Sequence, residues 1–521
     1  MLKYSMSNNS CKSLLVRGVN WIGDSVMTLP AIRAIKRSLP ESNISLLVKP
    51  WVSPIFEKNP FLDEILLYEN KHQGFFGKIR IANMLHRKRF LCAILFQNAF
   101  DAALLAFLSG IKERIGYDRD ARGFFLTKKI PLPEYYKQKH QIFYYLNLLE
   151  NIGIKTDLAY PYIYLLLEER LAARQTLINL RKPILGVNPG ATYGSAKRWF
   201  PERFAEIINW FISETGGSII IFGSKNETNI ADDIYKKILP AFRSPEIALN
   251  LAGNTSLREL ITLISECDVF VTNDSGPMHI AYAVRTPMVA IFGSTDPALT
   301  GPPPYAFMNN NIVIKSELSC SPCFKRECDK NDLNCMYAIT SDDVYFAIKK
   351  LLPFRSAVFF DRDGTLNMDS GYINRHEDFK VFDDISSLLK LKEKGFKIIG
   401  ISNQSGIGRG IVNESFVKEI NRIFIEKYGF DNFYHCPHIP EEHCACRKPE
   451  PEMLFLSRAE YKIDLKKSYV VGDKDSDMLL AKAVGAKAIL VQTGKLRESS
   501  CADYTAKNLI EAVDYILKCK N

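Results

Sequence analysis

AVFFDRDGT, residues 357–365, is the most informative stretch of the chain. Its four leading apolar residues predict a short buried strand. Asp361 and Asp363 follow at positions i and i+2, so that on an extended backbone both carboxylates face one side at the end of the strand. Gly364 allows a sharp turn directly after them. Two carboxylates this close repel each other, and oxygen ligands of this kind favour a bound Mg²⁺.

Three further segments follow in a fixed order: residues 402–405 after the apolar run 397–401, then Arg447-Lys448-Pro449, then residues 472–477 after the apolar run 469–471. An acidic residue at a strand end often only caps the next helix. Four polar segments in this order, counting Asp361–Thr365 as the first, favour a catalytic site instead. Together they resemble the haloacid dehalogenase superfamily of phosphatases.

This resemblance implies a Rossmann-like phosphatase domain and a role for each matching residue. Asp361 would be the nucleophile that takes up the phosphoryl group, and Asp363 would act as acid and base. The Mg²⁺ ligands would be Asp361, Asp473 and Asp363, the last through its backbone carbonyl. Ser402 and Lys448 would stabilise the charge on the phosphoryl group. The residues implied to line the substrate site are Asp369, Ser370, Gly371, Tyr372, Asn403, Gln404, Ser405, Arg447 and Lys474.

A group of metal-ligand residues lies just before Lys448. Three thiols and one imidazole complete a tetrahedral shell, so we predict a structural Zn²⁺ that fixes the loop carrying Arg447 and Lys448; its ligands are Cys436, His438, Cys444 and Cys446. Within the superfamily, the motifs resemble both the D-glycero-D-manno-heptose 1,7-bisphosphate 7-phosphatases and the histidinol-phosphate phosphatases.

The first 350 residues repeat a pattern of apolar strand, glycine-bearing loop and helix. Strands are expected at 13–18 and 44–48, and again at 184–187, 218–222, 268–272 and 288–292, with a helix over 25–38 and another over 165–180. This predicts an α/β protein with two doubly wound halves and a ligand site between them. We expect domains at 12–180, 181–350 and, after the linker 353–356, 355–521.

The motifs NWIGD (20–24), NPGA (188–191), KRW (197–199), NLAGNT (250–255) and TNDSGPMH (272–279) resemble glycosyltransferase family 9, the heptosyltransferases. The resemblance implies the GT-B fold and inverting transfer from ADP-heptose without a required metal. Asp24 would be the base that activates the acceptor hydroxyl, although an aspartate here could equally cap a helix. The implied donor-binding residues are Thr192, Lys197, Asp274, Ser275, Gly276 and His279, where His279 alone would more simply be a packed histidine.

Composition limits the remaining function classes. The chain has 521 residues and a net charge of +10, yet it shows no nucleic-acid-binding module, which favours an anionic substrate or a membrane surface. No apolar run is long enough to span a bilayer, and the polar N-terminal residues 1–10 do not form a signal peptide, so a soluble, cytoplasmic enzyme is expected. The basic positions 86–89, Arg119, Arg122, Lys128 and Lys129 are either solvated or contact an acidic acceptor at the inner membrane surface.

A second group of thiols, Cys320, Cys323, Cys328 and Cys335, has no standard zinc spacing, and its role stays open between a metal site and reduced packed thiols.

The two resemblances together predict one enzyme of lipopolysaccharide core heptose metabolism. The phosphatase would act on the heptose bisphosphate, and the transferase would use ADP-heptose and the lipopolysaccharide inner-core acceptor. Another enzyme must add the nucleotide between these steps. Three alternatives remain: histidinol phosphate as the phosphatase substrate, a non-catalytic phosphatase-like scaffold, and transfer to a different surface glycan.

Overall fold

The computed structural model describes residues 12–156, 160–303 and 310–520. The polar segment 1–10 therefore lies outside the described residues. The chain divides into two compact units, with the boundary between Leu351 and Leu352. No helix in the described ranges is both long and apolar enough to cross a bilayer.

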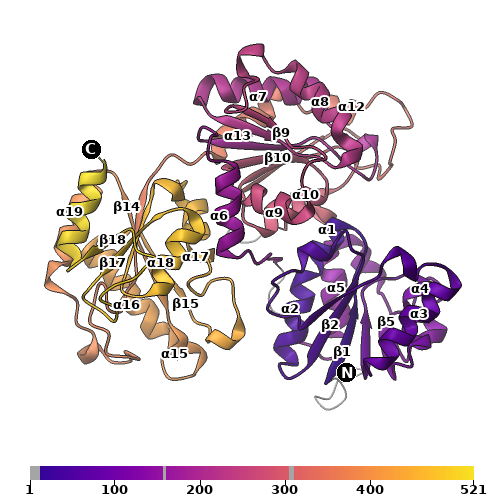
Figure 1. The fold of residues 1–521 in the computed structure, drawn as a ribbon, viewed down its shortest axis with the longest axis horizontal. Helices are drawn as coiled ribbons and strands as arrows, with labels where there is room; N and C mark the ends of the chain where they lie inside the picture. Colours follow the sequence, from indigo (N-terminus) through magenta and orange to yellow (C-terminus); the bar gives the residue numbers. More distant parts are fainter. Residues whose placement is uncertain (1–11, 157–159, 304–309, 521) are drawn as a thin grey trace. The chain divides into compact units, whose positions relative to one another are not determined.

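The first half of the first unit is a parallel sheet with the strand order β3-β2-β1-β4-β5-β6 (Figure 1). Its strands are β1 (Ser13–Arg17), β2 (Asn43–Val48), β3 (Glu64–Leu67), β4 (Cys92–Leu95), β5 (Glu113–Tyr117) and β6 (Lys128–Ile130). The accompanying helices are α1 (Ile22–Met27), α2 (Leu29–Ser38), α3 (Gly74–Arg87), α4 (Phe100–Leu108) and α5 (Gln141–Glu150).

After α6 (Leu167–Thr176), the second half repeats this architecture with the strand order β12-β11-β10-β7-β8-β9. Its strands are β7 (Ile184–Asn188), β8 (Ser218–Ile221), β9 (Ala248–Asn250), β10 (Val269–Asn273), β11 (Met288–Phe292) and β12 (Asn311–Lys315). Its helices are α7 (Pro201–Thr215), α8 (Thr228–Lys237), α9 (Leu257–Ser265), α10 (Gly276–Ala283), α11 (Pro297–Thr300), α12 (Asn334–Tyr337) and α13 (Ser341–Leu351).

The second unit is a third parallel sheet, with the order β15-β14-β13-β16-β17-β18. Its strands are β13 (Ala357–Phe360), β14 (Lys397–Asn403), β15 (Asn432–Cys436), β16 (Tyr469–Gly472), β17 (Lys487–Val491) and β18 (Tyr504–Ala506). Its helices are α14 (Leu389–Glu393), α15 (Ser405–Gly408), α16 (Glu414–Tyr428), α17 (Glu452–Tyr461), α18 (Asp475–Val484) and α19 (Leu509–Lys520).

Strand β13 is buried on both faces, as its apolar sequence predicts. Val358 and Phe360 belong to one core cluster, and Ala357 and Phe359 belong to the cluster on the opposite face of the sheet. Successive side chains of a strand point to opposite faces, so an unbroken apolar run is what a central strand covered by helices requires. The prediction of an α/β fold with parallel sheets is confirmed.

All three sheets share the order 3-2-1-4-5-6 counted within each sheet. In such a sheet the direction of winding reverses between the first and fourth strands, and ligands bind beyond the carboxyl ends of those strands. These strand pairs are β1 and β4, β7 and β10, and β13 and β16. The sheet order therefore places the expected sites after β1, β7, β10, β13 and β16.

The helix expected over residues 25–38 is instead two helices. Helix α1 begins at Ile22 and ends at Met27, and α2 begins at Leu29 with Pro30 in its first turn. Pro30 has no backbone N–H to donate to the preceding turn, so a continuous helix is interrupted at this point. The helix expected over 165–180 is shorter than predicted, since α6 covers Leu167–Thr176.

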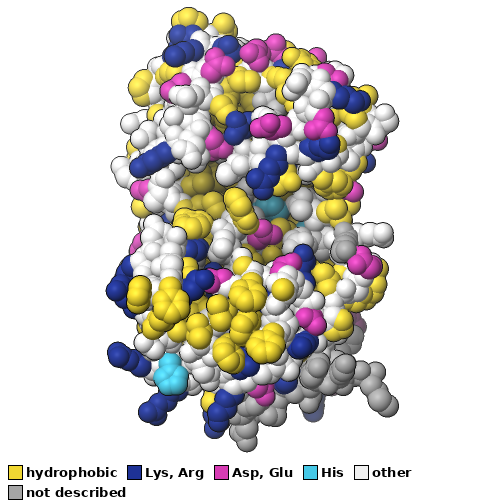
Figure 2. Space-filling model, turned by 90° about the vertical axis from the view of Figure 1, so that its right-hand side faces the viewer, with side chains coloured by type: hydrophobic (Ala, Val, Ile, Leu, Met, Phe, Trp, Pro, Cys, Tyr) yellow, Lys and Arg dark blue, Asp and Glu magenta, His cyan; other side chains and the backbone are white. Residues whose placement is uncertain are grey.

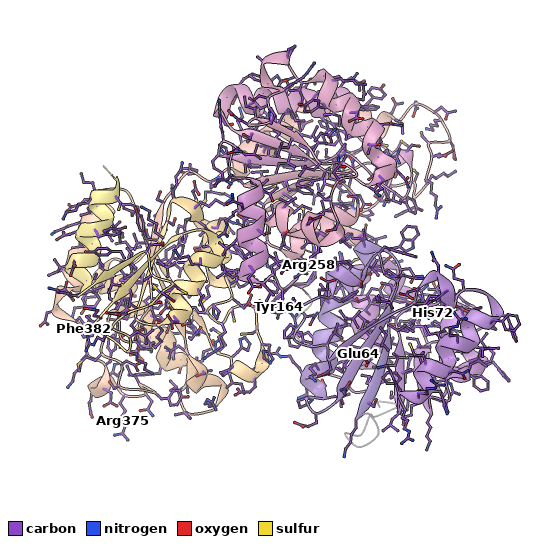
Figure 3. All side chains as sticks on the ribbon, viewed as in Figure 1. Glu64, His72, Tyr164, Arg258, Arg375 and Phe382 are labelled. Atoms are coloured by element: carbon purple, nitrogen blue, oxygen red, sulfur yellow. The ribbon has the colours of Figure 1, made fainter. Side chains whose placement is uncertain are left out.

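The two halves of the first unit are joined around a cavity, and Figure 2 shows the hollow between them. Arg258 on α9 donates to Tyr164 O at 2.7 Å and to Pro54 O at 3.0 Å, and it forms an ion pair with Glu169 at 2.6 Å (Figure 3). One guanidinium thus ties the second half to the first half and to the segment between them.

Candidate active sites

The first site is a group of buried carboxylates in the second unit. Asp361 follows β13, Asp473 follows β16, and Asp477 lies in the first turn of α18. One carboxylate oxygen of each lies within 4.8 Å of the others, and all three side chains are buried. The meeting of β13 and β16 at the winding reversal brings these distant positions together.

Lys448 partly neutralises this group. Its Nζ lies 2.6 Å from Asp361 Oδ1 and 2.6 Å from Asp477 Oδ1. Burial would raise the pKa of Asp361, but the charges of Lys448 and Lys474 outweigh it and hold this pKa below its usual range. Burial and the charge of Asp361 raise the pKa of Asp473 to about 7. Burial also raises the pKa of Asp477 to about 6, against the opposing charge of Lys448.

Lys474 Nζ lies 3.3 Å from Asp473 Oδ1, yet burial and the charge of Asp361 outweigh this cation and raise the pKa of Asp473. The Oδ1 atom of Asp473 is buried and has no hydrogen bond besides this ion pair, and a Cβ placed on Gly494 would come within 2.2 Å of Asp473 Oδ2, so the backbone packs closely around the carboxylate. Clustered carboxylate oxygens are the ligands that Mg²⁺ prefers. Asp361 and Asp473 therefore fit the divalent cation that the sequence predicts.

Asp363 lies beside this cluster with its carboxylate fixed by neighbours. Arg362 Nε donates to Asp363 Oδ1 at 3.0 Å and its Nη2 donates to Oδ2 at 3.0 Å. Asn367 Nδ2 donates to Oδ1 at 3.0 Å, and Gln404 Nε2 donates to Oδ2 at 2.8 Å. The backbone carbonyl of Asp363 accepts from Lys474 Nζ at 3.3 Å. A carboxylate held in this way keeps one orientation.

The other residues expected in this site divide into two groups. Gln404 donates to Ser402 Oγ at 2.7 Å, Asn403 Oδ1 accepts from Lys448 N at 3.0 Å, and Lys474 Nζ lies 3.6 Å from Asp369 Oδ2. These contacts join the predicted residues to the carboxylate cluster. Ser405 begins α15, Arg447 donates to His438 O, Ser370 donates to Asp378 O, and the remaining two, Gly371 and Tyr372, are exposed.

Sequence reasoning missed three residues of this site. Arg362 fixes Asp363, Asp477 pairs with Lys448, and Lys495 Nζ lies 3.4 Å from Asp369 Oδ2. Asp477 had a visible signal, since it stands one helical turn after Asp473 in the same acidic segment. Lys495 had none, because it lies in a loop after β17 with no motif around it.

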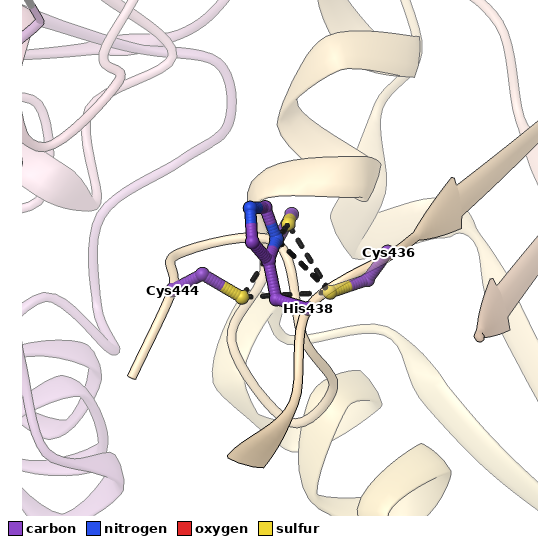
Figure 4. Close-up of side chains that lie close together, drawn as sticks. Cys436, His438 and Cys444 are labelled. Atoms are coloured by element: carbon purple, nitrogen blue, oxygen red, sulfur yellow. Dashed lines mark hydrogen bonds between the residues drawn. The ribbon is translucent and has the colours of Figure 1, made fainter. Parts of the chain in front are cut away.

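The predicted zinc ligands come together at the end of β15 (Figure 4). The three sulfur atoms of Cys436, Cys444 and Cys446 lie 3.3 to 3.5 Å apart, and His438 Nδ1 lies 3.3 Å from Cys446 Sγ. A tetrahedral zinc shell with Zn–S bonds of about 2.3 Å has sulfur–sulfur edges of about 3.8 Å. Small adjustments of the four side chains are therefore enough for them to surround one Zn²⁺ as a complete tetrahedral shell.

A Zn²⁺ held by these four residues should be lost when one thiol is removed. In Cys444→Ala, we expect loss of bound zinc and a decrease in Tm of about 10 °C or more for the second unit, because metal binding contributes directly to folding. Atomic absorption and scanning calorimetry measure both. Cys519→Ala, at an exposed cysteine of the same unit, is the matched control. Retention of stoichiometric zinc in Cys444→Ala would contradict the assignment.

The second site is a cavity of about 820 Å³ in the first unit. All seven predicted transferase residues line it: Asp24, Thr192, Lys197, Asp274, Ser275, Gly276 and His279. Asp24 comes from the first half and the other six from the second half. Close helix packing makes this possible, because a Cβ on Gly276 would lie 2.9 Å from Ile22 Cβ.

Asp24 lies in the first turn of α1. Trp21 is the N-cap residue, and its side chain makes no capping hydrogen bond, so Asp24 is not the cap. Tyr145 Oη donates to Asp24 Oδ1 at 3.3 Å. Burial raises the pKa of Asp24, while Tyr145 and Lys197 partly oppose this shift. A buried carboxylate of raised pKa facing a cavity is suited to accept a proton.

Lys197 and His279 have defined partners in the same cavity. Lys197 Nζ lies 2.5 Å from Asp274 Oδ2, and Thr295 Oγ1 donates to the same oxygen at 2.7 Å. His279 packs beside Gly23, and burial lowers its pKa to about 4, so the imidazole is neutral near pH 7. Sequence reasoning missed Tyr145 and also Glu227, which lines the cavity and packs against Gly190.

The structure also describes Arg122 and the second group of thiols. Arg122 is fully buried and donates to Tyr117 O at 2.9 Å and to Asn98 Oδ1 at 3.0 Å, so its assignment to a basic surface was wrong. The thiols of Cys320, Cys323, Cys328 and Cys335 do not form a metal-ligand group as close as that of Cys436 within the described ranges.

Comparison with known proteins now identifies both units. The pattern of glycosyltransferase family 9 (heptosyltransferase) matches residues 78–333, and a HAD-hydrolase-like pattern matches residues 445–516. Lipooligosaccharide heptosyltransferase 2 of Campylobacter jejuni is 31% identical over 340 residues, which are 64% of this chain and 96% of that protein. The D-glycero-beta-D-manno-heptose-1,7-bisphosphate 7-phosphatase of Helicobacter pylori is 38% identical over 173 residues, which are 32% of this chain and 99% of that protein.

The chain belongs to glycosyltransferase family 9, fused to a HAD-family phosphatase. The structure of Escherichia coli ADP-heptose heptosyltransferase II, with 24% identity and a TM-score of 0.56, covers 65% of this chain and 98% of that structure, which supports the same fold for the family 9 unit. The chain thus pairs a glycosyltransferase with a phosphatase, and the predicted fusion is confirmed.

Proposed function

We propose that the family 9 unit transfers heptose from ADP-heptose to a lipopolysaccharide inner-core acceptor, and that the phosphatase unit removes the C7 phosphate of D-glycero-D-manno-heptose 1,7-bisphosphate. The observation that carries this proposal is that one chain covers nearly the full length of both a heptosyltransferase and a heptose bisphosphate phosphatase. One sugar would then be the substrate of both units, with nucleotide addition by another enzyme between them. The proposed functional domains are residues 12–180, 181–350 and 355–521.

In the transferase, Asp24 accepts the proton of the acceptor hydroxyl as the hydroxyl oxygen attacks the anomeric carbon of the heptose. The bond from that carbon to ADP breaks, and the leaving diphosphate carries the negative charge. Lys197 and the N-terminus of α10, at Ser275 and Gly276, are placed to stabilise this charge. The neutral imidazole of His279 can donate a hydrogen bond to the donor without adding charge.

In the phosphatase, a carboxylate oxygen of Asp361 attacks the phosphorus, and the bond to the C7 oxygen breaks as Asp363 donates a proton to that oxygen. Asp363 then accepts a proton from water, which attacks the aspartyl-phosphate and releases phosphate. Lys448 and Ser402 stabilise the phosphoryl charge. Mg²⁺, held by Asp361, Asp473 and the carbonyl of Asp363, would supply additional positive charge for the phosphoryl oxygens.

The direct test supplies purified chain with each substrate separately. ADP release from ADP-heptose with inner-core acceptor measures transfer, and inorganic phosphate release from the heptose bisphosphate with Mg²⁺ measures hydrolysis. Histidinol phosphate is assayed in parallel. If histidinol phosphate is turned over faster than the heptose bisphosphate, histidinol phosphate becomes the proposed phosphatase substrate. If no heptose is transferred to the inner-core acceptor, the proposed acceptor is wrong.

We further propose that the transferase contacts the inner membrane surface through its first half. Six exposed residues of α3, α4 and the 3-10 turn Gly123–Phe125 form what we name the phenylalanine surface: Phe75, Phe76, Phe100, Phe107, Leu108 and Phe124. The side chains of Phe75, Phe76 and Phe124 are 73%, 82% and 84% exposed. Figure 2 shows hydrophobic side chains gathered on the lower part of this face, with basic side chains around them. Aromatic residues beside cations suit an anionic lipid surface.

The double variant Phe75→Ser/Phe76→Ser should bind phosphatidylglycerol vesicles about tenfold more weakly, because it loses two large apolar side chains from the interface.

Replacing Arg87, Lys88 and Arg89 by glutamine should weaken binding to these vesicles but not to phosphatidylcholine vesicles. Co-sedimentation measures both effects. Phe346→Ser, at a 58% exposed phenylalanine on α13, is the control. Equal binding of all variants would remove the membrane proposal.

A further inference from the structure

A second, smaller cavity of about 280 Å³ lies in the first half of the family 9 unit, and Asn20 is its one lining residue that belongs to the motifs quoted above. It is formed where four strands end and two helices begin. Arg17 ends β1, Lys49 follows β2, Tyr68 follows β3, and Gln97 follows β4, while Gly74 and Ala102 come from the first turns of α3 and α4. The carboxyl edge of a parallel sheet together with two helix N-termini is an environment that favours a negatively charged ligand.

Two cations in this cavity are buried without a carboxylate partner. Arg17 and Lys49 are 6% and 8% exposed. Arg17 donates to Gly18 O at 2.6 Å and Leu47 O at 3.0 Å, and approaches Asn20 Oδ1 at 3.4 Å. Among the described residues, Lys49 Nζ makes neither a hydrogen bond nor an ion pair, and it lies 4.1 Å from the centre of the Tyr68 ring. Buried charges in proteins are normally paired, so this arrangement lacks an anion.

The remaining charged groups of the cavity do not supply that anion. Lys78 Nζ lies 2.5 Å from Asp101 Oδ1, and Tyr68 Oη donates to Asp101 Oδ2 at 3.3 Å. Asp101 is thus the only carboxylate among the described lining residues, and it is already paired, against the three cations Arg17, Lys49 and Lys78. Burial and the neighbouring Arg17 lower the pKa of Lys49, and the charge of Asp101 opposes this shift only in part.

The cavity adjoins the catalytic one. Asn20 lines both cavities, and Trp51, which lines the catalytic cavity, donates from its indole N–H to Asn20 O at 2.8 Å. The Trp51 ring also lies 5.5 Å from Lys49 Nζ. Asn20 is four residues before Asp24 in the same loop and helix. A group bound in the small cavity would therefore lie next to the cavity that contains Asp24.

We propose that Arg17 and Lys49 form a subsite for an anionic substituent, a phosphate or a carboxylate, on the sugar acceptor of the transferase. This inference rests on the proposed transferase function. The subsite selects acceptors that carry the negative charge on a sugar next to the one that receives heptose. Lys78 is held by Asp101 and positions α3 against α4, so the two unpaired cations provide the recognition.

The first test measures KM for the intact acceptor in Lys49→Gln and in Arg17→Gln. Loss of one charge-assisted contact should raise this KM about 10- to 100-fold, with KM for ADP-heptose unchanged. Lys112→Gln, at an exposed lysine of the same half, is the matched control. Lys49→Arg, which keeps the positive charge, should have an acceptor KM close to that of the wild type. The unchanged KM for ADP-heptose, which binds in the same compact unit, confirms that each variant is folded. An unchanged acceptor KM in both glutamine variants would overturn the proposal.

The second test identifies the anion and separates this inference from the proposed function. The wild-type chain and Lys49→Gln are compared on intact, dephosphorylated and carboxyl-methylated acceptors. The modification that removes the bound anion should raise KM strongly in the wild type and much less in Lys49→Gln, where only Arg17 remains to contact the anion. Equal sensitivity of both proteins to each modification would contradict the subsite. If the chain transfers no heptose, Trp51 fluorescence with ADP present is titrated with inorganic phosphate: saturable binding lost in Lys49→Gln supports an anion site, and no such difference rejects it.

Discussion

Replacing Asp361 by asparagine should abolish phosphate release while heptose transfer continues at the wild-type rate. An amide oxygen is a poor nucleophile, so the variant cannot form the aspartyl-phosphate that the proposed mechanism requires. We expect a decrease in kcat of about 10⁴-fold or more, comparable to the loss of a nucleophile in other enzymes that form covalent intermediates. Transfer should be unaffected because Asp24 belongs to a separate compact unit.

The control for this experiment is Asp514→Asn, which changes an exposed aspartate of the same unit. Asp361→Asn should also keep its zinc, since Asp361 is not part of the cysteine group. If the parent chain itself releases no phosphate with Mg²⁺, the second unit is a phosphatase-like scaffold and not an enzyme. If Asp361→Asn retains activity, another group is the nucleophile.

Much of this fold follows from local sequence patterns. Short apolar runs ending in glycine or polar residues predicted the central strands of each sheet, because a strand buried on both faces must be apolar throughout. The break between α1 and α2 was also encoded, since Pro30 cannot donate the hydrogen bond that a continuous helix needs. It was missed because the apolar periodicity continues across the break.

The parts of the sites that sequence reasoning missed depend on contacts between distant segments. Arg122 and Lys49 look alike in the sequence, as single basic residues near strand ends. The structure buries Arg122 among carbonyl and amide oxygens that satisfy it, and it buries Lys49 beside a cavity without such acceptors. Only the packing of neighbouring strands and helices decides between these outcomes, and no local pattern records it.

The sites have a common structural origin. In each sheet the first strand and the fourth strand are neighbours, and the chemistry-bearing residues follow those strands: Asp361 and Asp473 in the phosphatase, and Asp274 after β10 in the transferase. The phosphatase forms its site within one sheet, whereas the transferase places residues from two sheets around one cavity. The transferase site therefore depends on how its two halves pack, which residues such as Gly276 and Arg258 determine.

Replacing Asp24 by asparagine should reduce kcat for heptose transfer by about 10²- to 10⁴-fold, the usual contribution of a general base. Phosphate release should not change. Asp342→Asn, at an exposed aspartate on α13, is the control. An Asp24→Asn variant with wild-type transfer would show that the acceptor hydroxyl is activated elsewhere.

The pH dependence of transfer tests the same assignment in the unmodified protein. Burial raises the pKa of Asp24, and the base must be deprotonated, so kcat/KM should fall as the pH decreases through a value above the ordinary aspartate pKa of about 3.9. Tyr145 donates a hydrogen bond that favours the charged carboxylate, so its removal raises this pKa further. In Tyr145→Phe, the acidic limb of the pH profile should therefore move to higher pH, while the limb of the phosphatase profile stays in place. A shift to lower pH, or none, would separate Asp24 from the proton transfer.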